Sequence, residues 1–310
     1  MRVAVTGANG LLGGEAVAQL LAAPEGHAVL AIGRGKSRLP PDAYRWASAD
    51  LAHPGETAAA LLAFRPDAVL HAGALTDVDA CEADPDLAWR ANADGTAEVA
   101  RACRAVGARL VAVSTDYVFD GTAGPYDEDA IPNPRGVYAR SKRCGEEAAL
   151  VLAPGAAVAR VAIVYGGRRG TRATFAESVV EKLSRGEAVR AFEDQQVSTT
   201  LASAGAARCL ELLLEHRYAG VLHVCDATVL GRVELAERIA ARFGLRGEII
   251  RIRTADANLP APRPLRNGLV TARAAALLRN RPLAIEEALD RLHAEWVERR
   301  GAVAGTERNP

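Results

Sequence analysis

The chain has 310 residues, with 38 basic and 38 acidic side chains, so its formal net charge at pH 7 is zero. Hydrophobic residues make up 49% and charged residues 25%, which excludes a chain that is disordered throughout. The balanced charge disfavours a general nucleic-acid binder but leaves room for a local basic pocket. No apolar run reaches the roughly 20 residues of a membrane span. The five cysteines are scattered, show no metal-ligand spacing and predict reduced thiols in a cytoplasmic protein.

Short apolar strands alternate with helical segments through the first half of the chain. Strands are predicted at residues 2–6, 28–32, 44–47, 68–71, 110–114 and within 157–165, and helices at 11–22, 57–64 and about 84–106. Nearly continuous apolar strands between helices are typical of a parallel sheet that is covered on both faces. The predicted fold is therefore α/β, with a Rossmann-type doubly wound parallel sheet.

The regular alternation of strands and helices ends after residue 165. Helices are predicted at 175–183, 201–216, 233–243, 272–278 and 285–299, with short strands at 221–224 and 248–253. We predict a Rossmann domain over residues 1–165, to which segments near 201–225 return. Residues 166–300 are predicted to form mainly a smaller C-terminal lobe, and residues 301–310 a flexible tail.

The segment from Thr6 to Gly13 joins the first predicted strand to the first helix, and its glycines have the spacing G-x-x-G-x-x-G. Gly7 permits a tight turn, Gly10 lets the backbone approach a pyrophosphate, and Gly13 lets the helix pack closely on the strand. The free N–H groups of the helix start favour phosphate. The alternative is a plain glycine turn. The predicted contacts to a dinucleotide are Gly7, Asn9, Gly10, Leu11, Leu12 and Gly13.

The residues after the second predicted strand indicate which dinucleotide binds. An acidic residue there would bind the ribose hydroxyls of NAD, but the first acid is Asp42. Arg34, Lys36 and Arg38 cluster there instead, and their cations suit the 2′-phosphate of NADP. The alternative is a solvated basic loop. Two residues after the third strand are expected near the adenine: Asp50 and Leu51.

A tyrosine and a lysine four residues apart, Tyr138 and Lys142, share one face of a predicted helix. The fifth strand ends in Ser114-Thr115-Asp116, at the sheet edge where α/β folds bind ligands. A neutral tyrosine can give a proton to an oxygen that gains charge as hydride arrives, and a nearby ammonium would lower its pKa. Thr115 can hydrogen-bond the same oxygen, and Lys142 can hold the nicotinamide ribose. The alternative is a pair of surface residues on a helix.

Three of these segments resemble the extended short-chain dehydrogenase/reductase superfamily: Thr6 to Gly13, Ala91 to Thr96, and Tyr138 to Lys142. A narrower resemblance is to the dTDP-4-dehydrorhamnose reductase family, in Ser114 to Gly121, Pro125 to Glu128, and Gly145-Glu146. It implies NADPH-dependent reduction of the 4-keto group of a nucleotide-linked 6-deoxysugar, in dTDP-L-rhamnose biosynthesis. It also implies that residues 1–165 bind NADP and that the C-terminal lobe binds the substrate.

The resemblance implies roles for single residues. Tyr138 would be the proton donor, Lys142 the ribose binder and tyrosine activator, and Thr115 the partner of the carbonyl. Asp116 matches a position beside the substrate, where the alternative is a carboxylate that stabilises a turn. His71 is expected to be structural. Further residues expected at the cofactor are Ala72, Gly73, Ala74, Asn92 and Ser114.

Three positions depart from the family pattern in the part expected to shape the sugar site. Ile163, Thr174 and Thr199 stand where the family often has tryptophan, asparagine and proline, so the exact substrate stays open. Three basic residues either meet a substrate pyrophosphate or form a solvated loop: Arg168, Arg169 and Arg172.

Two other functions remain alternatives. One is another nucleotide-sugar epimerase or reductase of the superfamily, and the other is a non-catalytic NADP-binding regulatory subunit. Apolar faces on the central helices fit a homodimer interface and core packing equally.

Overall fold

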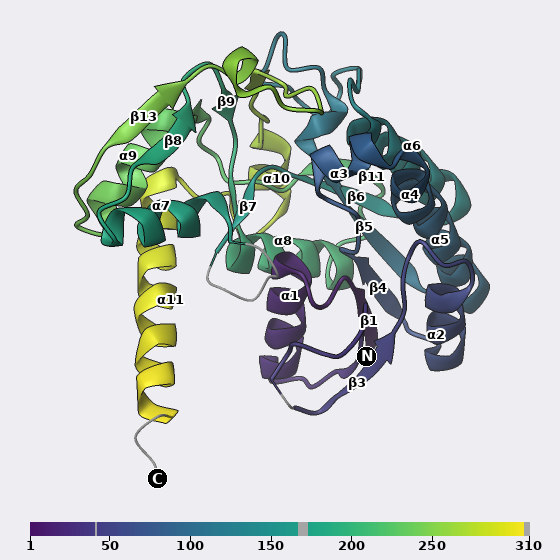
Figure 1. Cartoon of the computed structure of the whole chain (residues 1–310). Coiled ribbons are helices and arrows are strands. Elements are labelled where there is room, and N and C mark those ends of the chain that lie inside the picture. The colour runs from purple at the N-terminus through teal and green to yellow at the C-terminus, as the bar shows by residue number, and fades with distance from the viewer. Residues whose placement is uncertain (41, 167–172, 307–310) are drawn as a thin grey trace.

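The structure, a computed structural model, describes residues 1–40, 42–166 and 173–306, with side chains described as far as residue 298 (Figure 1). The helices are α1 (Leu11–Ala22), α2 (Glu56–Phe64), α3 (Val78–Ala83), α4 (Pro85–Trp89), α5 (Gly95–Val106), α6 (Val137–Leu152), α7 (Phe175–Ser184), α8 (Ala202–Leu214), α9 (Arg232–Arg242), α10 (Ala272–Leu277) and α11 (Ile285–Thr306). The strands are β1 (Arg2–Thr6), β2 (Ala28–Gly33), β3 (Tyr44–Ser48), β4 (Ala68–His71), β5 (Arg109–Thr115), β6 (Ala157–Val161), β7 (Val164–Tyr165), β8 (Val189–Phe192), β9 (Gln196–Val197), β10 (Thr200–Leu201), β11 (Gly220–His223), β12 (Leu230–Gly231), β13 (Ile249–Ile252) and β14 (Arg266–Asn267).

A parallel sheet of seven strands, in the order β11-β6-β5-β4-β1-β2-β3, forms the centre of the larger part (Figure 1). Helices α1 and α8 cover one face, and α2, α5 and α6 cover the other. The strand order reverses between β1 and β4, and ligands bind at such a point in open α/β sheets. The predicted doubly wound fold with a smaller C-terminal lobe is confirmed.

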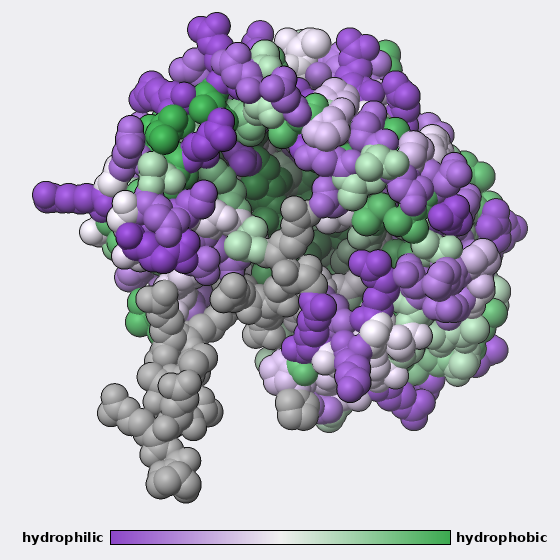
Figure 2. All heavy atoms as spheres, viewed as in Figure 1, coloured by the Kyte–Doolittle hydropathy of each residue, from purple (hydrophilic) through white to green (hydrophobic). Residues whose placement is uncertain are grey.

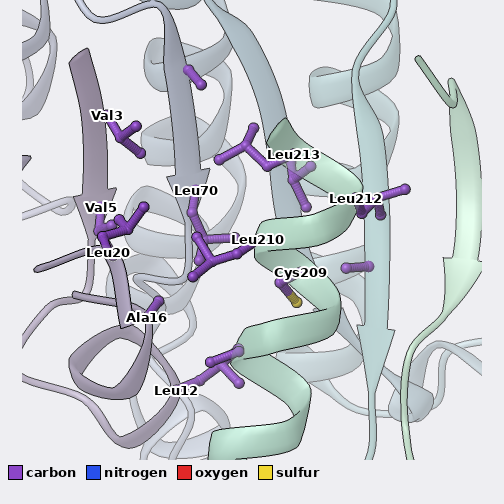
Figure 3. Packing of buried hydrophobic residues seen from close by; sticks show 14 of the residues in the cluster. Val3, Val5, Leu12, Ala16, Leu20, Leu70, Cys209, Leu210, Leu212 and Leu213 are labelled. Carbon is purple, nitrogen blue, oxygen red and sulfur yellow. The ribbon is translucent and has the colours of Figure 1, made fainter. Parts of the chain in front are cut away.

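Alternating residues of a strand in the main sheet belong to the two apolar cores on its opposite faces. Val3 and Val5 of β1 pack toward α1 and α8, where Leu210 and Leu213 meet them (Figure 3). Ala4, between them, belongs to the core on the opposite face. Successive side chains of a strand point to opposite faces, so a strand that is apolar throughout is buried on both.

The chain crosses between the two lobes more than once. After β10 it returns through α8, and β11 adds to the edge of the main sheet beside β6. The smaller lobe holds α7, α9 and the first half of α11 around a separate apolar core, with β8 and β13 paired at its edge. In Figure 1 this lobe lies beside the carboxyl ends of the main strands.

The helix predicted from about residue 84 to 106 is interrupted. Asp84 caps α4 through its side chain, a π-helical segment (Arg90–Asp94) follows, and α5 then runs to Gly107, whose φ of 74° ends it. A β-carbon on Gly95 would lie 2.8 Å from the Leu51 carbonyl oxygen, so the backbone at Gly95 lies directly against the loop that follows β3. Single π turns are frequent at functional sites.

Residues 301–306, at the start of the predicted flexible tail, continue α11 as far as Thr306. Ala302 and Ala304 favour helix, and neither Gly301 nor Gly305 interrupts α11 within the described residues. Residues 307–310 lie outside the described part. Over the ranges that the structure describes, no helix is long and apolar enough to cross a membrane.

Candidate active site

The glycine loop between β1 and α1 is shaped by close backbone contacts. Gly7 has a φ of 68°, and a β-carbon there would lie 2.6 Å from the Gly73 nitrogen, while one on Gly13 would lie 2.3 Å from the Gly7 oxygen. Among the residues that the structure describes, a β-carbon on Gly10 would meet only the Gly7 oxygen, at 3.0 Å, and no side chain caps α1. The first turn of α1 also contains Leu11 and buried Leu12. Free N–H groups beside an open glycine fit a dinucleotide pyrophosphate.

Asn9 holds the basic loop in place. Its side-chain amide donates to the carbonyl oxygens of Arg34 and Lys36, both at 3.0 Å, and its oxygen accepts from the Arg38 N–H at 2.9 Å. The three basic side chains are exposed, and Arg34 lies 3.8 Å from Asp50. The structure thus brings the predicted phosphate-binding cations together beside the glycine loop and gives Asn9 a bonding role in that loop.

His71, at the end of β4, is buried in a hydroxyl network. Its Nδ1 lies 2.7 Å from the Thr6 oxygen, and its Nε2 lies 3.0 Å from the Thr96 oxygen. Because the Thr96 hydroxyl donates to the Asn92 carbonyl oxygen, it accepts from Nε2–H, which makes Nδ1 the acceptor. Burial lowers the pKa of His71 to about 3, so the ring is neutral. Both ring nitrogens of His71 are therefore engaged, and the same Thr6 hydroxyl accepts a hydrogen bond from the Gly73 N–H. These bonds hold the end of β4, after which Gly73 follows.

Asn92 joins the segment after β4 to α6. Its side chain exchanges hydrogen bonds with the backbone of Leu75, at 2.8 and 3.0 Å, and donates to the Ser141 hydroxyl at 3.1 Å. The amide is fully buried within the π-helical segment. Asn92 therefore ties the segment from Ala72 through Ala74 to the helix that carries Tyr138.

Tyr138 lies at the start of α6, against the carboxyl end of β5. Its hydroxyl lies beside the Thr115 side chain, and its ring meets the Tyr117 ring edge-on with centroids 5.8 Å apart. Burial raises the pKa of Tyr138, which overrides the smaller lowering by Thr115. The expectation that Lys142 brings this pKa below its ordinary value is wrong in this structure, because loss of solvation dominates. The tyrosine is fully protonated at neutral pH.

Lys142 lies one turn further along α6 and is buried. Its ammonium donates to the Val113 carbonyl oxygen of β5 at 2.8 Å. Burial lowers the pKa of Lys142 to about 8, while Glu146, on the next turn, opposes that shift. Glu146 in turn binds Arg160 through two contacts of 2.8 Å, and Ser114 lies beside it. The buried ion pair between Glu146 and Arg160 thus lies one helical turn after Lys142.

Asp116 is buried next to Thr115 and is held from both lobes. One carboxylate oxygen accepts from the Thr115 hydroxyl at 3.1 Å, and the other accepts from the Asn267 side chain of β14 at 2.9 Å. Burial raises the pKa of Asp116 to about 7, against the lowering by those two hydrogen bonds. The carboxylate therefore titrates near neutral pH.

The smaller lobe supplies the opposite wall. Arg232, at the start of α9, stacks on the Phe175 ring of α7 with 4.1 Å from its guanidinium carbon to the ring centroid. Arg263 donates to Asp79 of α3 at 2.7 Å. Figure 2 shows that the surface is hollowed between the two lobes, with hydrophobic residues deep in the hollow.

The structure shows the surroundings of the positions that depart from the family pattern. Thr174 caps α7 and forms a capping box with Glu177, and both threonine and asparagine favour that position. Thr199 is buried with its hydroxyl beside the Tyr165 hydroxyl. Ile163 has a φ of 22°, which a β-branched residue rarely adopts. The basic residues expected either to meet a substrate pyrophosphate or to form a solvated loop lie outside the described residues: Arg168, Arg169 and Arg172.

Two polar residues at the site were missing from the sequence prediction, Asn267 and Arg232. Asn267 lies 151 positions from the carboxylate that it binds. Arg232 opens an ordinary amphipathic helix. Neither belongs to a local pattern, because the packing of the two lobes creates both contacts.

Comparisons with known proteins agree with this site. The family model described as RmlD substrate binding domain matches residues 1–297. The dTDP-4-dehydrorhamnose reductase of Mycobacterium tuberculosis is 37% identical over 269 residues, which cover 84% of this chain and 82% of that protein. The crystal structure of dTDP-4-dehydrorhamnose reductase from Bacillus anthracis in complex with NADP has a TM-score of 0.83 at 27% identity and covers 95% of this chain and 99% of that one.

A hypothetical dTDP-4-dehydrorhamnose reductase from Sulfolobus tokodaii has a TM-score of 0.80 at 32% identity, over 92% of this chain and 98% of that one. The resemblance predicted from the sequence motifs is thereby confirmed. Because the match spans nearly the whole described fold, the chain belongs to the RmlD substrate binding domain family, among the dTDP-4-dehydrorhamnose reductases.

Proposed function

We propose that this protein uses NADPH to reduce the 4-keto group of a nucleotide-linked 6-deoxysugar, and that the substrate is dTDP-4-dehydrorhamnose, on the path to dTDP-L-rhamnose. The names of the similar proteins support the substrate class. The observation that carries the chemistry is the Tyr138 hydroxyl, which lies beside the Thr115 hydroxyl at the carboxyl end of β5. The tyrosine hydroxyl can give a proton, and the threonine hydroxyl can hydrogen-bond the oxygen that receives it.

The cofactor role belongs to the larger part, residues 1–165 together with the returning segment 201–225. The open side of Gly10 and the uncapped start of α1 would hold the pyrophosphate, and the basic loop ordered by Asn9 would hold the 2′-phosphate. Bound NADPH supplies a hydride to the sugar carbonyl carbon. The crystal structure of the relative with NADP supports this choice of cofactor.

The chain's own residues would manage the proton. Tyr138, kept neutral by burial, donates its proton to the sugar O4 as charge develops there. Thr115, whose hydroxyl now donates to Asp116, would turn it to that oxygen. The Lys142 ammonium, now bound to the Val113 oxygen, would hold the nicotinamide ribose and support the tyrosinate that remains.

The setting and assembly of the protein are part of the proposal. Among the described residues all five cysteines are free, which suits a reducing cytoplasm. A homodimer through the central helices α4 to α6 would follow the superfamily resemblance, with Trp89 at the end of α4 among the exposed apolar residues.

The test is NADPH consumption by the purified protein with a panel of nucleotide-linked 4-keto sugars. Wild type should reduce dTDP-4-dehydrorhamnose, and Tyr138→Phe should lose roughly 100-fold or more in rate while it still binds NADPH. Tyr218→Phe is the matched control, since its hydroxyl bonds the Val221 oxygen away from the site. No reduction of any sugar by wild type would refute the proposal. Sugar isomerisation without net NADPH consumption would identify an epimerase instead.

A further inference from the structure

The Thr115 hydroxyl has one proton, and in this structure that proton is directed at Asp116. The Thr115 oxygen lies 3.1 Å from Oδ1 of Asp116, and it also accepts a hydrogen bond from the Tyr117 N–H at 3.2 Å. An ionised carboxylate has no proton to give, so toward it the hydroxyl must be the donor. The proposed reduction needs the same proton on the sugar carbonyl oxygen. Asp116 and the substrate therefore compete for one hydrogen bond.

Asp116 lacks the cation that often accompanies an ionised buried carboxylate. Over the described residues it forms no ion pair, although it is only 3% exposed, and its partners Thr115 and Asn267 are neutral. Loss of solvation disfavours the charged form of a carboxyl group, so these surroundings stabilise the acid. Two other buried carboxylates each contact an arginine, at 2.8 and 2.7 Å: Glu146 on Arg160, and Asp226 on Arg208.

Asn267 determines which oxygen of the acid carries the proton. Its side-chain N–H donates to Oδ2 of Asp116 at 2.9 Å, and the residue is 1% exposed. A proton on Oδ2 would face that donor, whereas a proton on Oδ1 faces the Thr115 oxygen. The acid form of Asp116 can therefore donate to Thr115, and the proton of the Thr115 hydroxyl can then turn to the substrate.

The strand that carries Asn267 is fastened on two sides. It pairs with β9, where Asn267 lies opposite Val197. The backbone of Arg266 also donates to the Gly121 carbonyl oxygen at 2.8 Å and accepts from the Gly124 N–H at 3.1 Å, in the loop that follows Asp116. The Asn267 amide is thus held in place relative to Asp116.

The other titratable groups that act on Asp116 keep one charge state near neutral pH. Burial raises the pKa values of Tyr117 and Cys225 to about 12, and it raises the pKa of Tyr138 above its ordinary value. Arg232 of α9 attracts the carboxylate, but no ion pair joins the two among the described residues. Burial outweighs the hydrogen bonds to Asp116 and raises its pKa to about 7.

We propose that Asp116 works in its acid form, as a positioning residue that donates to Thr115 and thereby turns the Thr115 hydroxyl toward the sugar carbonyl oxygen. Asn267 keeps the proton of the acid on the side of Thr115. This inference rests on the proposed function and adds a dependence on pH: reduction slows when Asp116 ionises, because the hydroxyl then returns to the carboxylate. Asp116 keeps its proton throughout, so only hydrogen bonds change there.

The experiment measures the rate constant of hydride transfer in single turnovers of the full-length protein, from the loss of NADPH absorbance with dTDP-4-dehydrorhamnose at pH 6 and pH 8. Asp116→Asn imitates the acid, because its amide N–H can donate to Thr115 at every pH while its oxygen accepts from Asn267. The ratio of the wild-type rate constant to that of Asp116→Asn should fall about tenfold from pH 6 to pH 8, as a group with a pKa of about 7 loses its proton. Lys142 titrates in both proteins and cancels in the ratio.

Three further variants separate this role from a loss of structure. Asn267→Ala removes a hydrogen bond to the ionised carboxylate, so the midpoint of the pH profile should move to higher pH, and Asn267→Ser should move it back. A merely structural loss would lower the rate constant at every pH and leave the midpoint in place, which would overturn the part given to Asn267. Asp129→Asn is the matched control: its carboxylate is 78% exposed and pairs with Arg273, so its ratio to wild type should be the same at both pH values.

The outcomes separate this inference from the proposed function. A wild-type protein that reduces the sugar, with a ratio to Asp116→Asn that stays constant or rises with pH, would overturn the role of Asp116 alone. Infrared difference spectra of the two proteins without sugar should show a protonated carboxyl group at pH 6, and its absence would overturn the acid form without reference to activity. If wild type reduces no nucleotide-linked keto sugar, the proposed function fails and this inference fails with it. Thermal unfolding of each variant checks that it folds.

Discussion

Asp116 offers a direct test of the electrostatics of the site. It is buried, and its carboxylate accepts hydrogen bonds from the neutral side chains of Thr115 and Asn267. Burial raises its pKa from 3.8 to about 7. Replacement by asparagine keeps the size of the side chain and an oxygen for Asn267 to donate to, and it removes the charge.

The sign of the effect follows from proton binding. Unfolded Asp116 releases its proton near pH 3.8, whereas folded Asp116 keeps it until about pH 7. Between those values the folded state binds more protons, so the free energy of unfolding of wild type falls as the pH rises. Each pH unit in that window costs about 1.4 kcal/mol, so the window from pH 5 to pH 7 is worth about 3 kcal/mol. Asp116→Asn avoids this loss.

The assay is urea unfolding of wild type and Asp116→Asn at pH 5 and pH 8. The variant should gain about 3 kcal/mol relative to wild type between the two pH values. Other titrating groups, such as His71 and His223, are common to both proteins and cancel in the difference. The same difference in stability at both pH values would show that Asp116 does not titrate in this window, and the argument from burial would be refuted.

Two further predictions concern the cofactor loop. Asn9→Ala removes the side-chain bonds to the backbone of the basic loop without changing its charge, and should cut the preference for NADPH over NADH about tenfold in KM ratios; an unchanged ratio would show that the loop needs no such support. Gly13→Ala places a β-carbon 2.3 Å from the Gly7 oxygen and should cost about 1–3 kcal/mol in urea unfolding and abolish the rise in Tm on adding NADPH; a normal rise would contradict the tight loop.

Local patterns were sufficient to predict the parallel sheet and to identify the segments that meet at its carboxyl edge. The alternation of strands and helices predicted that the sheet is parallel, and the predicted bounds of the first helix agree with α1. The glycine loop, the end of β5 and the start of α6 are each short motifs whose geometry depends on neighbouring residues. Because parallel strands place their carboxyl ends along one edge, these motifs come together without further information.

Contacts across the two lobes could not be predicted in this way. The pairing of Asn267 with Asp116 depends on how the smaller lobe is packed, and a lone asparagine on a two-residue strand carries no pattern. The π-helical turn around Asn92 has the same limitation, since it shifts hydrogen bonds by one position within an otherwise helical sequence.

A sequence motif also does not show how far its side chains are removed from solvent. The spacing of Tyr138 and Lys142 suggested that the ammonium would lower the tyrosine pKa, but burial acts on both groups and moves each toward its neutral form. The consequence is a tyrosine that stays protonated at neutral pH, which is the form that the proposed reduction needs. With Lys142 still largely charged below its pKa of about 8, the site at neutral pH holds a proton to give and a cation to compensate its loss.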